Sequence, residues 1–164
     1  MKKLFLILAI VVILPVAVFA EWGIGGAAFY KSPILLGQPV DIGNLNVNQF
    51  SFGGDVRLKL GWFQAEGLLL YSAGDVDSLN VFLDVGVALE VAILRLSLGA
   101  GPNFTNNFGQ SPPVQAGLNA KVGADVKLGP ISLGLSYIMA LNIDNGIDIA
   151  TSSGLLGVQV LFWL

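Results

Sequence analysis

The sequence predicts an all-β fold: an eight-stranded antiparallel up-and-down transmembrane β-barrel that follows a cleaved signal peptide. Apolar and polar residues alternate with a period of two along most of the chain, as in strands with two different faces. Hydrophobic residues make up 54% of the 164 residues. Charged residues make up only 12%, whereas they make up about a quarter of typical soluble domains. No stretch after residue 20 approaches the roughly 20 apolar residues of a membrane-spanning helix. A closed barrel is the other structure that pairs all hydrogen-bonding groups of its backbone within lipid.

Residues 1–20 have the features of a secretory signal peptide. Two lysines form a positive n-region, residues 4–18 form an apolar h-region, and residues 18–20 read V-F-A at the expected cleavage site. A transmembrane anchor is the alternative, but about 15 apolar residues are short for one. We therefore expect cleavage before Glu21, which leaves one domain, residues 21–164.

The strands follow from the alternation in chain order. Residues 50–62 carry aromatic and aliphatic residues at nearly every even position, and three charges among small residues at the odd positions. Residues 79–91 are equally regular, with only Leu and Val on one face. The same pattern predicts the remaining strands at about residues 22–30, 64–73, 94–104, 114–128, 131–143 and 150–164.

The connections between these strands alternate in length. Tight turns are expected near residues 61–63, 92–93 and 129–130, and longer segments with turn residues at 31–48, 74–77, 105–113 and 144–148. Short turns at one end and longer loops at the other are typical of outer-membrane barrels, with the short turns in the periplasm.

The apolar face is expected to point outward, because eight strands enclose a lumen only just wide enough for side chains to fill. The Leu, Val, Ile and aromatic face would overfill this lumen, whereas the face rich in Gly, Ser, Ala and Asn fits it. A secreted soluble barrel with its apolar face inside is the alternative. Aromatic residues near the strand ends of the outer face suit girdles at the membrane interfaces: Trp22, Tyr30, Phe50, Trp62, Tyr71 and Phe162.

The last strand carries a pattern that resembles a known family. Residues 157–162, G-V-Q-V-L-F, are similar to the barrel-insertion signal of small outer-membrane barrels of the OmpX, OmpA-domain and OmpW type, with Gly157 followed by outward Val160 and Phe162. The chain departs from this pattern at Leu155, where a polar residue is usual, and in extending two residues past the aromatic. The resemblance implies insertion by the barrel-assembly machinery into the lipid of a diderm outer membrane.

Ten charged residues are predicted to point into the lumen, five acidic and five basic. Because an unpaired buried charge costs several kcal/mol, this balance predicts ion pairing, and we expect Lys59 to lie beside Glu66 and Glu90 beside Arg95. A closed, ion-paired plug is favoured over a selective pore. The ten residues are Asp55, Arg57, Lys59, Glu66, Asp84, Glu90, Arg95, Lys121, Asp125 and Lys127.

Five acidic residues fall in the predicted external loops: Asp41, Asp75, Asp77, Asp144 and Asp148. Their oxygens suit Ca²⁺ or Mg²⁺, but we favour solvated loop charge and expect no cofactor and no bound metal. Nucleic acid is excluded as a partner because the chain, with 11 acidic and 8 basic residues, has no basic footprint. The chain has no His and no Cys, so a Ser–His or Cys–His catalytic site is absent and no enzyme is predicted.

These features predict a monomeric outer-membrane barrel with an ion-paired, plugged lumen and a structural role in the envelope. The first alternative is a narrow channel for small or hydrophobic solutes, resembling the OmpW type, with residues 34–36 as an apolar external mouth. The second alternative is a surface adhesion or interaction protein that acts through its acidic loops.

Overall fold

The computed structural model describes residues 20–31, 46–74, 76–111, 114–142 and 148–164, with only the backbone for residues 141–153. The predicted signal peptide up to residue 19, and the apolar segment 34–36, lie outside these ranges. Within the described ranges, no helix is long and apolar enough to cross a bilayer.

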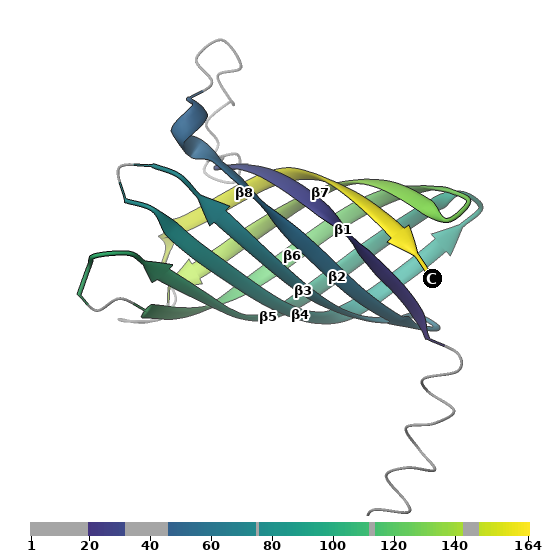
Figure 1. Cartoon of the computed structure of the whole chain (residues 1–164). Helices are drawn as coiled ribbons and strands as arrows, with labels where there is room; N and C mark the ends of the chain where they lie inside the picture. Colours follow the sequence, from purple (N-terminus) through teal and green to yellow (C-terminus); the bar gives the residue numbers. More distant parts are fainter. Residues whose placement is uncertain (1–19, 32–45, 75, 112–113, 143–147) are drawn as a thin grey trace, which may run out of the picture.

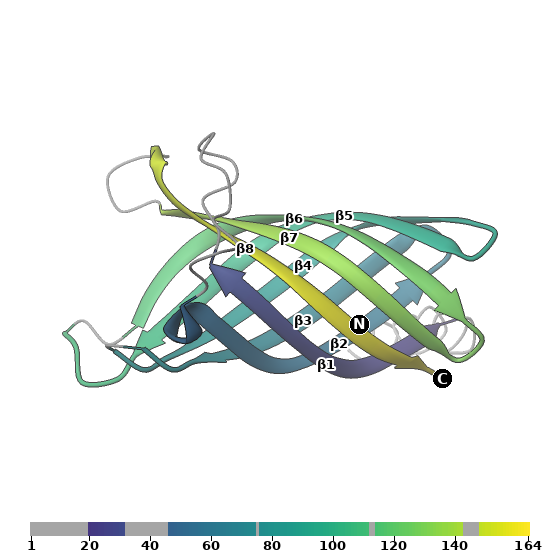
Figure 2. The same ribbon diagram turned by 90° about the horizontal axis from the view of Figure 1, so that it is seen from above.

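The described residues form one closed antiparallel barrel in which each strand pairs with its neighbours in sequence and β1 pairs with β8 (Figures 1 and 2). This up-and-down topology confirms the predicted all-β, eight-stranded antiparallel barrel. A short 3₁₀ turn, η3 (Val47–Gln49), precedes β2. The strands are β1 (Glu21–Lys31), β2 (Phe50–Leu60), β3 (Phe63–Ser72), β4 (Ser78–Val91), β5 (Leu94–Asn107), β6 (Val114–Leu128), β7 (Ile131–Asn142) and β8 (Asp148–Trp163).

The end of β2 differs from the prediction by two residues, and so does the register of the first hairpin. The structure ends β2 at Leu60 and makes a two-residue turn, Gly61–Trp62, with a positive φ of 60° at the glycine. Arg57 therefore pairs with Glu66 and Lys59 with Gln64. The prediction that Lys59 lies opposite Glu66 is wrong, because it placed the centre of the turn too far along the chain.

The second tight turn has the predicted register. Glu90 pairs with Arg95 across a two-residue turn in which Ala92 has a φ of 54°, so this neighbour prediction is confirmed. At the opposite end of the same hairpin, β5 continues to Asn107 rather than ending at residue 104. The three added residues pair with the start of β4 on one side and, in part, with β6 on the other, which explains why polar residues remain in a strand.

The two faces of the sheet have the predicted orientations. Outward apolar side chains are exposed along every strand, for example Val85 at 70% and Leu135 at 55%, whereas inward Asp55 and Arg95 are fully buried. Of the six predicted girdle aromatics, four are exposed: Trp22, Trp62, Tyr71 and Phe162. Tyr30 and Phe50 are half-buried against each other, with ring centroids 5.0 Å apart, and Trp62 lies in a turn instead of a strand.

The seam that closes the barrel contains a close fit between Phe29 of β1 and Gly157 of β8, which face each other in register. A Cβ atom on Gly157 would lie 2.3 Å from the Phe29 ring, a separation that no side chain adopts. The Phe29 ring, only 1% exposed, therefore occupies the space that a side chain at residue 157 would take.

We expect Gly157→Ala to lower the free energy of unfolding by about 1–3 kcal/mol, because overpacking a close contact forces backbone or side-chain shifts. Urea unfolding of the refolded mature chain in detergent measures this without the insertion machinery. Gly26→Ala in β1 is the matched control, since its Cβ would meet no heavy atom closer than 3.9 Å. Adding Phe29→Leu to Gly157→Ala should recover part of the loss; equal stability of the two glycine variants would contradict the fit.

Candidate functional site: the filled lumen and its loop-side cavity

The lumen holds three sets of inward side chains and one cavity along the barrel axis. Salt bridges link a rim cluster at the turn end, which consists of Glu21, Lys59, Glu90, Arg95 and Lys127. Next comes a central network of Asp55, Arg57, Glu66, Asp84, Lys121 and Asp125, with Asn119 and Gln159. An apolar seal follows, made of Ala27, Phe29, Leu68, Leu70, Phe82 and Ile138. A polar cavity opens beyond the seal at the loop end.

Arg57 is the centre of the central network, and its guanidinium group joins four strands. It donates to Asp55 Oδ2 on β2 at 2.9 Å and to Asp125 Oδ2 on β6 at 2.9 Å. Its Nη2 also donates to Gln159 Oε1 on β8 at 2.6 Å, and its Nε lies 3.4 Å from Glu66 Oε2 on β3. Such multiple charge-assisted hydrogen bonds suit the planar, forked donor group of arginine.

The central network contains more acids than bases, four against two. Lys121 on β6 bonds to Glu66, and Asn119 donates to Asp84. One oxygen each of Asp55 and Asp84 has no hydrogen-bond partner among the described residues. Glu66 and Asp84 lie directly opposite each other on β3 and β4, an arrangement in which like charges repel. The ammonium group of Lys121 and the amide of Asn119 offset this repulsion.

The rim cluster is less enclosed and combines three bases with two acids. Lys59 Nζ lies 2.7 Å from Glu90 Oε1, and Lys127 Nζ lies 3.3 Å from the same oxygen. Glu21, whose side chain is 46% exposed, bridges all three bases: Lys59 at 3.6 Å, Arg95 at 3.3 Å and Lys127 at 3.5 Å. The residue expected to begin the mature chain therefore takes part in closing the turn end.

Trp163, at the end of β8, lies inward at the same end of the barrel. The Arg95 guanidinium carbon lies 3.7 Å from the centre of its ring, within cation–π range. The indole N–H donates to Ser132 Oγ at 2.9 Å. Trp163 extends past the aromatic that usually ends the insertion pattern, and here its side chain packs on the rim cluster.

The apolar seal lies between the charged layers and the loop end. Phe29, Leu68, Leu70 and Ile138, from β1, β3 and β7, are each 1% exposed or less. Within the central network, the space beside Gln64, Glu66 and Asp84 measures only about 10 Å³, roughly the room of one water molecule. The described residues thus fill the lumen at mid-height with side chains.

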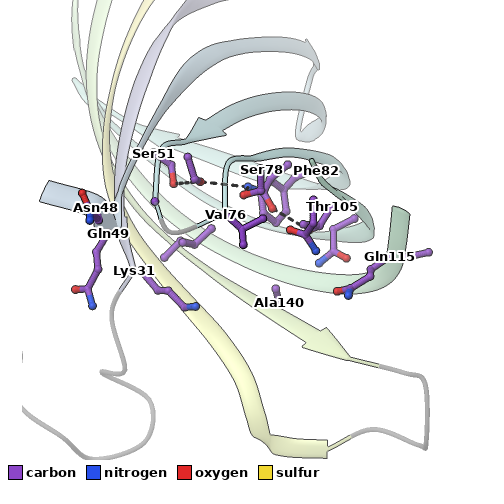
Figure 3. Close-up of a pocket in the computed structure, with 17 residues that line it drawn as sticks. Lys31, Asn48, Gln49, Ser51, Val76, Ser78, Phe82, Thr105, Gln115 and Ala140 are labelled. Carbon is purple, nitrogen blue, oxygen red and sulfur yellow. Dashed lines mark hydrogen bonds between the residues drawn. The ribbon is translucent and has the colours of Figure 1, made fainter. Parts of the chain in front are cut away.

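Beyond the seal, the loop-side cavity has a volume of about 450 Å³. Its wall carries mainly amide and hydroxyl groups, and Figure 3 shows Ser51, Ser78 and Thr105 grouped on one side, with Phe82 beside them. Lys31 is the one charged residue among the described lining residues. Phe82 belongs to both the lining and the seal, so the seal forms the floor of the cavity.

The structure places all ten predicted lumen charges on the inner side of the barrel, eight of them buried and Glu90 and Lys127 at the more open rim. Sequence reasoning missed Glu21, Gln159, Asn119 and Trp163 as participants. The alternating pattern could have identified them, because each of the four lies at an inward-facing position of its strand. Sequence reasoning also missed the seal, although Phe29 and Phe82 stand on largely polar faces near the loop ends of their strands, and Leu68 and Leu70 follow each other on the inward face of β3.

The predicted acidic loops are only partly described. Asp41, Asp75 and Asp144 lie outside the described residues, and Asp148 belongs to β8 instead of a loop. Within the described ranges, no group of three or more acidic, His or Cys residues has a geometry that holds a metal ion. The insertion pattern lies on β8, with Gly157 inward and Val160 and Phe162 exposed at 51% and 49%.

Comparisons with known proteins define the class of the fold. No protein-family model and no curated protein sequence matches this chain. Among solved structures, the N-terminal β-barrel domain of Pseudomonas aeruginosa OprF aligns with a TM-score of 0.67 and 12% identity, over 88% of this chain and 97% of that one. Ail, the attachment invasion locus protein of Yersinia pestis, aligns with a TM-score of 0.51 and 14% identity, also over 88% and 97%. The fold is that of the small eight-stranded outer-membrane β-barrels.

We expect Arg57→Met to lower the free energy of unfolding by about 3–5 kcal/mol, because it leaves the buried carboxylates of the central network without their main partner. Urea unfolding in detergent is the measurement. The matched control, Lys127→Met, removes a partly exposed cation from the rim cluster and should cost less than half as much. Comparable losses in the two variants would contradict the central place of Arg57.

The corrected register makes a second prediction that double-mutant cycles can check. Arg57→Met and Glu66→Gln should show a coupling energy of at least about 0.5 kcal/mol, because the two side chains are in contact. The cycle between Lys59→Met and Glu66→Gln should be additive within about 0.5 kcal/mol. Stronger coupling for the second pair would support the register first expected from the sequence.

Proposed function

We propose that this protein is a monomeric barrel of the outer membrane of a diderm bacterium, with a closed lumen and a structural role in the envelope. The single observation that carries the proposal is the filled cross-section at mid-height. A fully buried, multiply bonded Arg57 and a contiguous apolar seal occupy the space that a conducting pore needs open.

The surface of the barrel supports the proposed location. Exposed Leu, Val, Ile and Phe side chains cover the outside of all eight strands, a pattern that suits lipid and would be costly in water. Lipid is therefore the proposed environment of the barrel wall. We further propose that the insertion machinery recognises Gly157, Val160 and Phe162 on β8.

The two alternatives have less support. A narrow channel would need both the charged layers and the seal to move, because each of them blocks the axis at its own height. Adhesion through acidic loops depends on residues that lie largely outside the described ranges. No enzymatic activity is part of the proposal, since the sequence has neither His nor Cys.

The proposal predicts a silent bilayer. Residues 21–164, refolded and inserted in a planar bilayer, should give no discrete conductance steps at voltages where a known porin, measured alongside, does. Insertion is verified by the mobility difference between unheated and boiled samples, because the folded barrel resists detergent until heated. Reproducible steps would contradict the closed lumen and favour the channel alternative; in that case Lys121→Met should change the ion selectivity.

A further inference from the structure

We propose that the loop-side cavity is a binding site for a neutral polyhydroxylated ligand, a sugar unit of an oligosaccharide. The proposal goes beyond the structural role. The volume of the cavity, about 450 Å³, lies within the range of small-ligand sites. The seal closes its floor, so a molecule that enters is held there instead of passing through.

The lining has the chemistry that sugar hydroxyls require. Each sugar hydroxyl both donates and accepts, and side-chain amides present a donor and an acceptor side by side. Gln49, Asn107 and Gln115 line the cavity, and their side chains form no hydrogen bond with another described residue. Within the described part of the chain, these amides therefore keep both their donors and their acceptors for a ligand.

Four further polar side chains are already held in place by one another. Asn80 Nδ2 donates to Ser72 Oγ at 3.3 Å, and Asn80 Oδ1 accepts from Thr105 Oγ1 at 2.8 Å. Ser51 Oγ and Ser72 Oγ are 2.5 Å apart and share a hydrogen bond. This series of hydrogen bonds crosses β2, β3, β4 and β5 and leaves lone pairs of the hydroxyls unused. A prearranged set of this kind lowers the entropic cost of binding.

Charge selects against ions. Among the described lining residues only Lys31 carries a charge. Lys31 is exposed at the end of β1, where water screens its charge, so a carboxylate would gain little from it. An ammonium group would meet no carboxylate among the described lining residues. Taking a charged group out of water without a partner is costly, whereas neutral hydroxyls find partners on several sides. A neutral sugar is therefore preferred over its charged analogues.

Saturation-transfer NMR on the refolded mature chain tests the proposal, in a zwitterionic detergent that carries no sugar headgroup. The probes are maltose and lactose, together with glucose and its charged analogues glucosamine and glucuronate. We expect transfer to at least one neutral sugar and weaker transfer to both charged analogues. Absence of transfer to every neutral sugar, or equal transfer to the charged analogues, would overturn the proposal.

Variants locate the signal within the barrel. Thr105→Val, which keeps the shape and removes the hydroxyl, and Gln115→Met should each weaken binding roughly 2- to 10-fold, the range of one lost hydrogen bond. Ser97→Ala is the control, because Ser97 lies below the seal beside Gln64 and Lys121. Gln115 is exposed, so its variant tests binding even where Thr105→Val fails to fold. Unchanged affinity in Gln115→Met and in folded Thr105→Val would overturn the assignment to this cavity.

A second arm separates the two sources of such a sugar. Nanodiscs that contain lactosylceramide present the disaccharide on a lipid, and free lactose is then titrated as before. Blocked binding of free lactose assigns the site to a glycolipid headgroup, whereas unchanged binding assigns it to a free saccharide; either result requires the cavity to bind. Because this assay measures no conductance, its failure is distinguishable from failure of the proposed structural role.

Discussion

The buried guanidinium group of Arg57 is the interaction on which the interior of this barrel depends. It reaches carboxylates on β2, β3 and β6 and an amide on β8, so one side chain ties together strands on opposite sides of the lumen. Its charge is needed because four carboxylates share the central network with only two bases. An eight-stranded barrel is just narrow enough for a single side chain to span it in this way. The small number of strands that closes the sheet therefore also allows side chains to close the lumen.

Much of the fold was predictable because the barrel has an apolar outer face and a polar lumen, and the alternation of apolar and polar residues reflects that contrast. All eight strands and the up-and-down order follow from it. The boundaries were less certain where sequence alone could not fix the turn: Gly61 and Trp62 form the turn, and this shift moves Glu66 from Lys59 to Arg57. Polar residues 105–107 read as loop, yet pairing with β4 and β6 keeps them in β5.

The interior was predictable in its charges but not in its layers. The alternating pattern identified the ten ionisable residues that point inward. Which of them contact one another depends on the stagger of the strands, which is a property of the closed barrel. The seal was not predicted because β1, β3, β4 and β7 each contribute only one or two apolar residues to it. In any one strand, these residues only briefly interrupt a largely polar face. The loop-side cavity likewise has no motif, since Ser72, Asn80 and Thr105 gather only when three strands are in register.

Cysteine accessibility tests the central claim, a lumen sealed between the cavity and the charged layers, most directly. The natural chain has no Cys, so Ser78→Cys, in the cavity lining, and Ser136→Cys, beside Gln159 below the seal, report on the two compartments. A charged, membrane-impermeant thiol reagent is added from the loop side to each refolded variant in vesicles, with folding checked by heat-dependent mobility. The sealed lumen predicts rapid labelling at residue 78 and labelling at residue 136 only after unfolding. Similar labelling rates at both positions in the folded barrel would contradict it.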